Sequence, residues 1–182
     1  MQSKSQEKIL LAAAEIDLAL VRIAAEIVEK LSPRDEFAII GIRRRGVHLA
    51  QRLCDKLSAT LKRPILNGIL DITLYRDDLT TVSERPMLRE TLIDFDINNL
   101  SLVLVDDVLF TGRTVRAALD GLVDLGRPKR VQLAVLIDRG HRELPIQADY
   151  VGKHVQTEDD ETVEVRLKEE DNEERVVLMR KL

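Results

Sequence analysis

The stretch LSLVLVDDVLFTGRTVRAALDGLVDL, residues 100–125, constrains the fold more than any other part of the chain. Its apolar run, residues 102–105, ends in two carboxylates, Asp106 and Asp107. Unbroken runs of leucine and β-branched residues are typical of parallel strands buried on both faces. From Thr114 onwards, apolar residues recur at helical spacing. The stretch therefore predicts a strand, a loop and a helix, with the loop at the carboxyl end of a central strand, where open α/β sheets bind ligands.

The loop between this strand and helix has the composition of a phosphate site. Thr111, Gly112, Arg113 and Thr114 combine two hydroxyls, a guanidinium and a glycine at which the backbone can bend or approach a ligand. The free N–H groups of a helix N-terminus point at the same spot. Together these groups favour a phosphate monoester.

Asp106 and Asp107 are unsuited to the same phosphate, because like charges repel. Carboxylates accept hydrogen bonds from ribose hydroxyls, and they also bind magnesium. A phosphate on one side and a diol on the other indicate a ribose 5-phosphate. Alternatively, the acids end the strand and the threonines cap the next helix. Capping accounts for one acid and one threonine, but not for the whole group within nine residues.

A second strand, FAIIGI at residues 37–42, ends in Arg43, Arg44, Arg45 and Gly46, and a helical pattern follows. Amides and guanidinium groups together suit a diphosphate anion, so this turn is a candidate pyrophosphate cradle. The alternative is an exposed basic turn. Residues 65–75 predict another strand, and a polar loop then carries Arg76, Arg85 and Arg89. Long loops without secondary structure are often functional lids, and the alternative is a disordered surface loop.

Residues 131–137 predict a further buried strand, which ends in a turn containing Arg139 and His141. Arg139 is a candidate to close over a planar base or the pyrophosphate. His141 could act as an acid or base, but a plain surface histidine is an equally good interpretation. Residues 162–168 and 174–180 alternate apolar and polar positions and predict a β-hairpin. Residues 13–31 predict an amphipathic helix whose apolar stripe is wider than one sheet face requires.

Composition is that of a globular chain, 45% apolar and 33% charged, and 182 residues predict one domain spanning 1–182. No apolar run approaches the roughly 20 residues of a membrane span, and no signal peptide is evident, so we expect a cytoplasmic protein without membrane contacts. The lone Cys54 excludes an internal disulfide and is interpreted as a core residue. Residues 158–174 carry a local charge of −8 and are interpreted as a solvated face.

The segment VLVDDVLFTGRT resembles the phosphoribosyl pyrophosphate (PRPP) signature of type I phosphoribosyltransferases. The segments DITLYRDDL, GRPKRVQLAVLIDRGHRELP and ADYVGK are similar to the PyrR family within them, the uracil phosphoribosyltransferases that also attenuate pyrimidine operons. The resemblance implies an α/β fold with a mainly parallel central sheet flanked by helices, and a C-terminal hairpin or hood. It implies transfer from PRPP to uracil, giving UMP and pyrophosphate, with Mg²⁺ carried by PRPP and no direct protein ligands.

The same resemblance implies specific site residues. The catalytic group comprises Asp106, Asp107 and Arg76. Further residues that bind PRPP or UMP are Arg44, Arg45, Val108, Leu109, Phe110, Thr111, Gly112, Arg113 and Thr114. Arg139 and Val163 would lie on the base or pyrophosphate side. The expected assembly is a homodimer or a multiple of it.

A UMP-sensing, RNA-binding attenuator of messenger RNA leaders is the alternative function. The RNA-binding members of the family carry threonine, histidine and arginine where this chain has Val21, Ala25 and Gln147. Because polar and cationic groups hold folded RNA, these departures favour catalysis over regulation. A dinucleotide-binding oxidoreductase is disfavoured, since no GxGxxG sequence follows a predicted strand.

Overall fold

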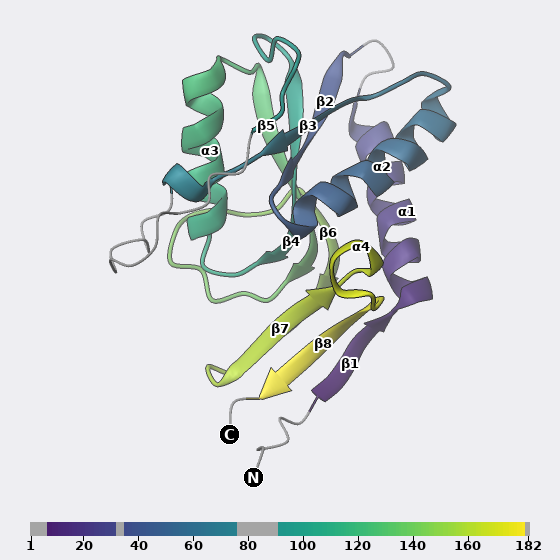
Figure 1. Cartoon of the computed structure of the whole chain (residues 1–182), viewed down its shortest axis with the longest axis vertical. Coiled ribbons are helices and arrows are strands. Elements are labelled where there is room, and N and C mark those ends of the chain that lie inside the picture. The colour runs from purple at the N-terminus through teal and green to yellow at the C-terminus, as the bar shows by residue number, and fades with distance from the viewer. Residues whose placement is uncertain (1–6, 32–34, 76–90, 181–182) are drawn as a thin grey trace.

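The computed structural model describes residues 7–31, 35–75 and 91–180, and two sheets dominate it (Figure 1). The larger sheet has five parallel strands in the order β3-β2-β4-β5-β6. Its strands are β2 (Phe37–Ile42), β3 (Leu66–Leu70), β4 (Ser101–Leu109), β5 (Arg130–Asp138) and β6 (Tyr150–His154). The smaller sheet is antiparallel, in the order β1-β8-β7, with β1 (Glu7–Ala12), β7 (Glu161–Arg166) and β8 (Arg175–Arg180).

Helices cover both faces of the five-stranded sheet. Helices α1 (Ala13–Lys30) and α2 (Arg45–Leu61) lie on one face, and α3 (Arg113–Leu125) lies on the other (Figure 1). Alternate strand residues divide accordingly, with Ile39 and Val103 facing the α1 and α2 side and Ile40 and Leu104 facing α3. Burial on both faces explains why these strands read as unbroken apolar runs. The expected α/β architecture is confirmed.

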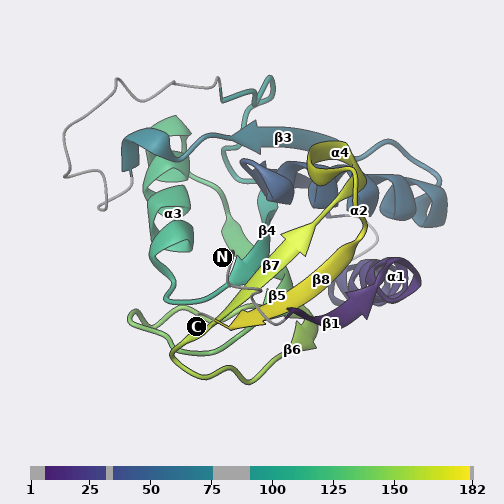
Figure 2. The ribbon, with the colours of Figure 1, turned by 60° about the horizontal axis from the view of Figure 1, so that its bottom comes forward.

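The antiparallel sheet lies beyond the carboxyl end of β4 and forms the expected hood (Figure 1). The predicted C-terminal hairpin is confirmed, and β1 adds a third strand from the other end of the chain. A single-turn helix, α4 (Lys168–Asp171), connects β7 to β8 and lies beside α2 (Figure 2). The hood is thus attached to the main sheet through α1 on one side and α4 on the other.

Two strand boundaries differ by more than two residues from the sequence expectation. The strand predicted over 65–75 ends at Leu70, and Thr73–Tyr75 form a 3-10 turn, η1. The Asp71 carboxylate accepts hydrogen bonds from the N–H and the hydroxyl of Thr73, which turns the chain out of the sheet. Strand β4 in turn continues four residues past Val105, because its ladder with β5 extends to the pair Leu109 and Asp138.

The acidic segment 158–174 is not simply a solvated face. Several of its carboxylates form ion pairs with α2, including Asp171 with Arg45 and Glu174 with Arg52. Cys54 is buried in the core as expected, and burial raises the pKa of its thiol to about 12. Within the described ranges, no helix is long and apolar enough to cross a membrane.

Candidate active site

Three loops meet at the carboxyl edge of the parallel sheet. They follow β2 at residues 43–44, β4 at residues 110–112 and β5 at residues 139–142. Main-chain hydrogen bonds fix the first and third loops to neighbouring strands, from Arg43 N to Leu70 O at 3.0 Å and from Arg139 N to Leu109 O at 3.1 Å. Parallel pairing brings these strand ends to one side, as the sequence argument required.

The two acids of β4 lie in different environments. Asp106 is 6% exposed, whereas Asp107 is half-buried. The Asp107 N–H donates to Asp106 Oδ1 at 2.9 Å, and the Val108 N–H donates to Asp107 Oδ1 at the same distance. Burial, followed by repulsion from Asp107, raises the pKa of Asp106 well above its usual value. Asp107 is therefore the carboxylate better placed to meet a ligand.

The N-terminus of α3 forms a compact loop of the kind that binds anions. Gly112 has a φ of 94°, a left-handed conformation that side chains rarely adopt. The first intrahelical bond runs from Arg116 N to Gly112 O at 2.9 Å, and the Arg113 N–H donates to Thr111 Oγ1 at 3.4 Å, so the first turn of α3 faces this loop. The N–H groups of Glu143 and Leu144 donate to Thr111 O and support the loop from behind. Thr114 is exposed, and the Arg113 side chain contacts Glu143 Oε2 at 2.6 Å.

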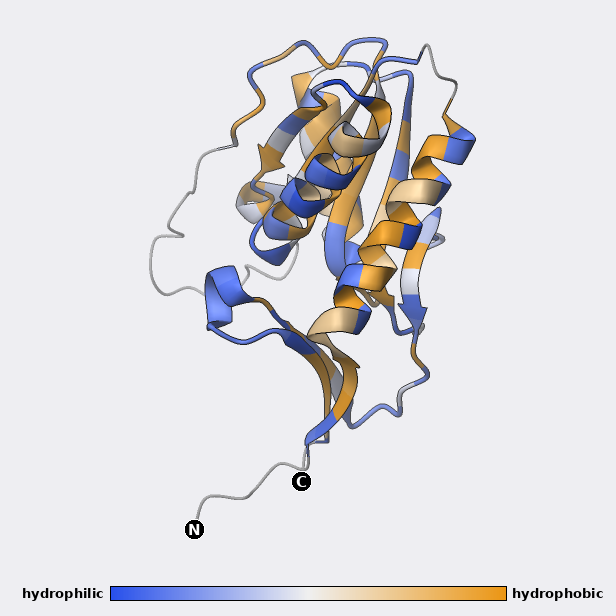
Figure 3. Ribbon diagram, turned by 90° about the vertical axis from the view of Figure 1, so that its right-hand side faces the viewer, coloured by the Kyte–Doolittle hydropathy of each residue, from blue (hydrophilic) through white to orange (hydrophobic). Residues whose placement is uncertain are grey.

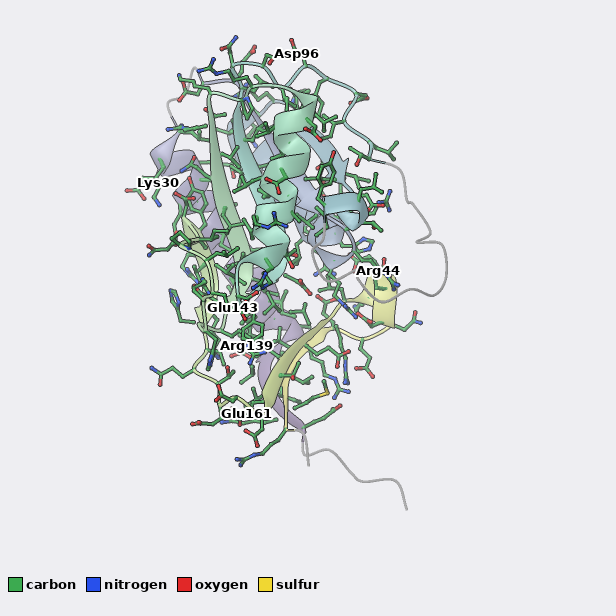
Figure 4. All side chains as sticks on the ribbon, turned by 90° about the vertical axis from the view of Figure 1, so that its left-hand side faces the viewer. Lys30, Arg44, Asp96, Arg139, Glu143 and Glu161 are labelled. Atoms are coloured by element: carbon green, nitrogen blue, oxygen red, sulfur yellow. The ribbon has the colours of Figure 1, made fainter. Side chains whose placement is uncertain are left out.

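The arginine turn after β2 approaches β4 closely. A Cβ added to Gly46 would lie 2.4 Å from Val105 O, so only glycine allows α2 to begin this near to the acids. Arg44 is exposed at the start of α2, next to α4 (Figure 4), and the peptide between Arg43 and Arg44 is cis. Hydrogen bonding to Asp171, with further attraction from Asp107, raises the pKa of Arg45. The structure thus brings Arg45 near the β4 acids.

Arg139 is held rigidly at the third loop. Its side chain donates to Thr157 Oγ1 at 3.2 Å and to the Glu161 carbonyl at 2.8 Å, and Figure 4 shows it beside the hood. Its guanidinium carbon lies 3.9 Å from the Phe110 ring centroid, a cation–π contact between two expected site residues. Together with Thr157 it lines a cleft of about 820 Å³ between the carboxyl ends of β5 and β6 and the segment leading into the hood.

The remaining residues expected at the site differ in how far their side chains are buried. Leu109 is buried and Val108 is half-buried on β4, whereas Phe110 is 40% exposed. The side chain of Val163 is 7% exposed and belongs to the hydrophobic core. Arg76, with the other arginines of the polar loop, lies outside the described residues.

Sequence reasoning missed three residues that hold this site in place. Glu143 contacts Arg113, Thr157 contacts Arg139, and Asp171 contacts Arg45. Each lies between 18 and 126 residues from its partner, so no local spacing could have revealed the pair. The local charge of −8 at 158–174, opposite a basic turn, was the one available signal.

Comparison with solved structures shows which known fold the chain has. A hypoxanthine-guanine phosphoribosyltransferase from Bacillus anthracis superposes with a TM-score of 0.72 at 17% identity, covering 96% of this chain and 98% of that one. A hypoxanthine phosphoribosyltransferase from Trypanosoma cruzi gives a TM-score of 0.71 at 21% identity, covering 97% and 96%. The fold is that of the phosphoribosyltransferases.

Sequence comparison defines the family more narrowly. The family model described as "Phosphoribosyl transferase domain" matches residues 6–170. Proteins named "Bifunctional protein PyrR" are 58% identical over 161 residues in Pelotomaculum thermopropionicum and 55% identical over 169 residues in Deinococcus radiodurans. These alignments cover 88% and 93% of this chain, and 89% and 92% of the relatives. The chain therefore belongs to the phosphoribosyl transferase domain family and, within it, to the PyrR proteins.

Proposed function

We propose that this protein is a uracil phosphoribosyltransferase, which converts uracil and PRPP into UMP and pyrophosphate. The observation that carries the proposal is the meeting of three features at one sheet edge. These are the open N-terminus of α3, the half-buried Asp107 and the arginine turn that starts α2. A phosphate, a diol and a pyrophosphate are the three groups that PRPP presents, in that order along the molecule.

Each group has a proposed partner. Thr111, Gly112, Arg113 and Thr114 hold the 5-phosphate with N–H and hydroxyl groups. Asp107, supported by the buried Asp106, accepts hydrogen bonds from the ribose hydroxyls and stabilises positive charge that develops on the ribose ring. Arg44 and Arg45, with Arg76 from the polar loop, receive the departing pyrophosphate. Val108, Leu109 and Phe110 connect the first two groups along the end of β4.

In the reaction, uracil N1 forms a bond to C1′ of the ribose, and the C1′–oxygen bond to pyrophosphate breaks with its electron pair leaving on that oxygen. The N1 proton is released to solvent. Arg139 lies over Phe110 at the base side, where the main chain of the loop after β5 can match the edge of a uracil ring. We also propose that Val163, on strand β7 of the hood, borders the ligand on the same side, as the family resemblance implies.

Mg²⁺ fits this donor set as a partner of PRPP. Magnesium in such sites keeps several waters and binds one or two carboxylates together with substrate phosphates. Asp107 supplies a half-buried carboxylate at this sheet edge, which would face the waters kept by a magnesium ion that PRPP carries. When bound, the ion neutralises charge on the pyrophosphate leaving group.

The alternative function, UMP-dependent RNA binding, is less well supported by the surface. Val21, Ala25 and Gln147 are exposed, so the three departures from the RNA-binding pattern lie where an RNA would meet them. Two cations near them, Arg22 and Lys153, donate to main-chain carbonyls of this chain. We therefore rank catalysis above regulation.

The decisive experiment is release of pyrophosphate from PRPP and Mg²⁺ by the purified protein, with each nucleobase in turn. We expect uracil to be used fastest, because a site that hydrogen-bonds one base edge rejects mismatched edges strongly. Asp107→Asn serves as the matched control, since it removes one negative charge but keeps the shape. Its turnover should fall by roughly 100-fold or more, with an unchanged circular dichroism spectrum. Faster turnover of hypoxanthine or adenine would contradict the proposal.

A further inference from the structure

The single-turn helix α4 of the hood docks onto α2 through a row of hydrogen-bonded side-chain pairs. Arg45, His48 and Arg52 are spaced three and four residues apart, so they form one stripe along α2. Arg45 contacts Asp171, His48 Nε2 lies 3.0 Å from Glu170 Oε1, and Arg52 contacts both Glu169 and Glu174. The acids of the hood therefore face a basic stripe that begins at the candidate active site.

The first pair of this row has two-point geometry. Arg45 Nε lies 3.1 Å from Asp171 Oδ2, and Arg45 Nη2 lies 2.8 Å from Asp171 Oδ1. Side-on pairing of this kind fixes the plane of the guanidinium as well as its position. It engages the Nε and Nη2 edge of Arg45 and directs the Nη1 edge away from Asp171.

The Asp171 carboxylate is also held by a main-chain hydrogen bond that does not involve Arg45. Its Oδ2 accepts a hydrogen bond from Leu167 N at 2.9 Å, and its own N–H donates to Leu167 O at 2.7 Å. The carboxylate is consequently anchored on α4, and a preorganised partner fixes a flexible arginine at little additional entropic cost. Hydrogen bonding from Arg45 lowers the pKa of Asp171, so the pair remains charged at neutral pH.

Arg45 also lies close to the acids of β4, because a Cβ added to the next residue, Gly46, would lie 2.4 Å from Val105 O and 3.2 Å from Asp106 Cα. A ligand bound at Asp107 would accordingly meet Arg45 in the orientation that Asp171 sets. We infer that Asp171 is a positioning residue for pyrophosphate binding, which acts by holding the Arg45 guanidinium with its Nη1 edge towards the diphosphate. This inference rests on the proposed function in assigning pyrophosphate to Arg45.

The test is the affinity of the protein for pyrophosphate and Mg²⁺, measured by calorimetry without a nucleobase. Asp171→Asn keeps an oxygen for Leu167 N–H and removes the charge that orients Arg45. We expect its affinity for pyrophosphate to fall roughly tenfold, as for loss of one charge-assisted hydrogen bond. In turnover assays the KM for PRPP should rise by a similar factor, whereas kcat at saturating PRPP should change less than about threefold.

Glu169→Gln is the matched control. It removes the same charge from the same helix, and Arg52 keeps its second partner, Glu174. Its pyrophosphate affinity should stay within about twofold of wild type, which separates positioning of Arg45 from general loss of acidity in the hood. Asp171→Glu, which keeps the carboxylate, should recover most of the affinity that Asp171→Asn loses. A failure of this recovery would count against the positioning role.

A double-mutant cycle with Arg45→Gln completes the test. If Asp171 acts through Arg45, Asp171→Asn should have little further effect on pyrophosphate binding once Arg45 is replaced. Additive losses would overturn the inference, and so would tighter binding by Asp171→Asn, which would mean that Asp171 competes with the ligand. The calorimetric test contains no nucleobase, so its outcome does not depend on uracil turnover. A lack of uracil turnover would refute the proposed function without refuting this inference.

Discussion

The main-chain N–H of Asp107 donates a 2.9 Å hydrogen bond to the carboxylate of its neighbour Asp106. This bond favours the ionised form of Asp106, but burial and repulsion from the Asp107 carboxylate outweigh it, and the pKa of Asp106 is raised. An ionised Asp106 is therefore costly to the folded state. Sites built for function often carry such a cost in stability.

Replacement of Asp106 by Asn should stabilise the protein at neutral pH. A folded-state pKa above the ordinary value of 3.8 means that the native protein loses stability as pH rises from about 4 through the raised pKa. Asparagine does not ionise, so the gain in melting temperature over wild type should grow across the same pH range. A gain of about 1 kcal/mol corresponds to roughly 2–4 °C in a chain of this size.

Thermal unfolding of wild type and Asp106→Asn between pH 4 and 8 measures this difference. Asp107→Asn is the control, because its half-buried side chain should give a smaller gain. A difference in melting temperature that stays constant across the pH range would contradict the explanation.

Replacement of Gly46 by Ala should damage both stability and pyrophosphate binding. The new Cβ would lie 2.4 Å from Val105 O and 3.2 Å from Asp106 Cα, and main-chain atoms of a central strand move little. Displacement of α2 should cost about 2 kcal/mol, and pyrophosphate should bind more weakly because Arg45 moves with the helix.

Gly121→Ala is the matched control, since it also adds a methyl group to a helical glycine. Its Cβ would meet the half-buried ring of Tyr75 at 3.3 Å, and this side chain can shift. The better helix propensity of alanine offsets that contact, so stability should remain within about 1 kcal/mol of wild type. Chemical denaturation of both variants tests the comparison, and equal losses of stability would show that the contact with β4 is not the cause.

The strands that are buried on both faces could be predicted closely from the sequence, because solvent exclusion leaves an unbroken apolar run. The strand at 37–42 was predicted with its observed bounds. The end of β4 was not, since Asp106 and Asp107 read as a strand terminus although pairing with β5 continues through them. The contact of Arg45 with Asp171 joins residues 126 apart, and local pattern carries no information about such a pair.

We also expect a homo-oligomer, a dimer or a multiple of it. Ile16, Leu20 and Ile23 of α1 are buried in the core, but Leu18 and Val21 are 67% and 47% exposed. Figure 3 shows that apolar residues recur along the whole length of α1. Val21 also lines an apolar groove of about 500 Å³ between α1 and α2. Apolar surface of this kind is typical of subunit interfaces.

Light scattering at micromolar concentration measures the assembly. The wild-type mass should be at least twice 20.7 kDa, and the variant Leu18→Glu should shift it downwards. Val123→Glu, on the exposed face of α3, is the control and should leave the mass unchanged. A wild-type mass near 20.7 kDa would contradict the expectation of an oligomer.

The last prediction concerns RNA, which we expect to bind only weakly. Arg142 is a cation close to Gln147. It donates hydrogen bonds to the carbonyls of Phe110, Gly140 and Ile146 and to the Asp138 carboxylate. Burial alone would raise the pKa of Asp138, but hydrogen bonds from Arg142 and from Gly140 N–H outweigh it, and that pKa is lowered. The Arg142 guanidinium therefore stabilises the loop after β5, and we do not expect it to hold RNA tightly.

A filter-binding titration with a pyrimidine-operon leader hairpin, at near-physiological salt and with or without UMP, tests this prediction. Wild type should form no nanomolar complex, and UMP should not tighten the binding. The triple variant Val21→Thr, Ala25→His, Gln147→Arg restores the polar pattern and should bind more tightly. Its dependence on salt should also steepen, by roughly one unit of slope for each new phosphate contact. Because these positions lie outside the proposed PRPP site, uracil turnover should not change in the triple variant. A nanomolar, UMP-stimulated wild-type complex would reverse the ranking of catalysis above regulation.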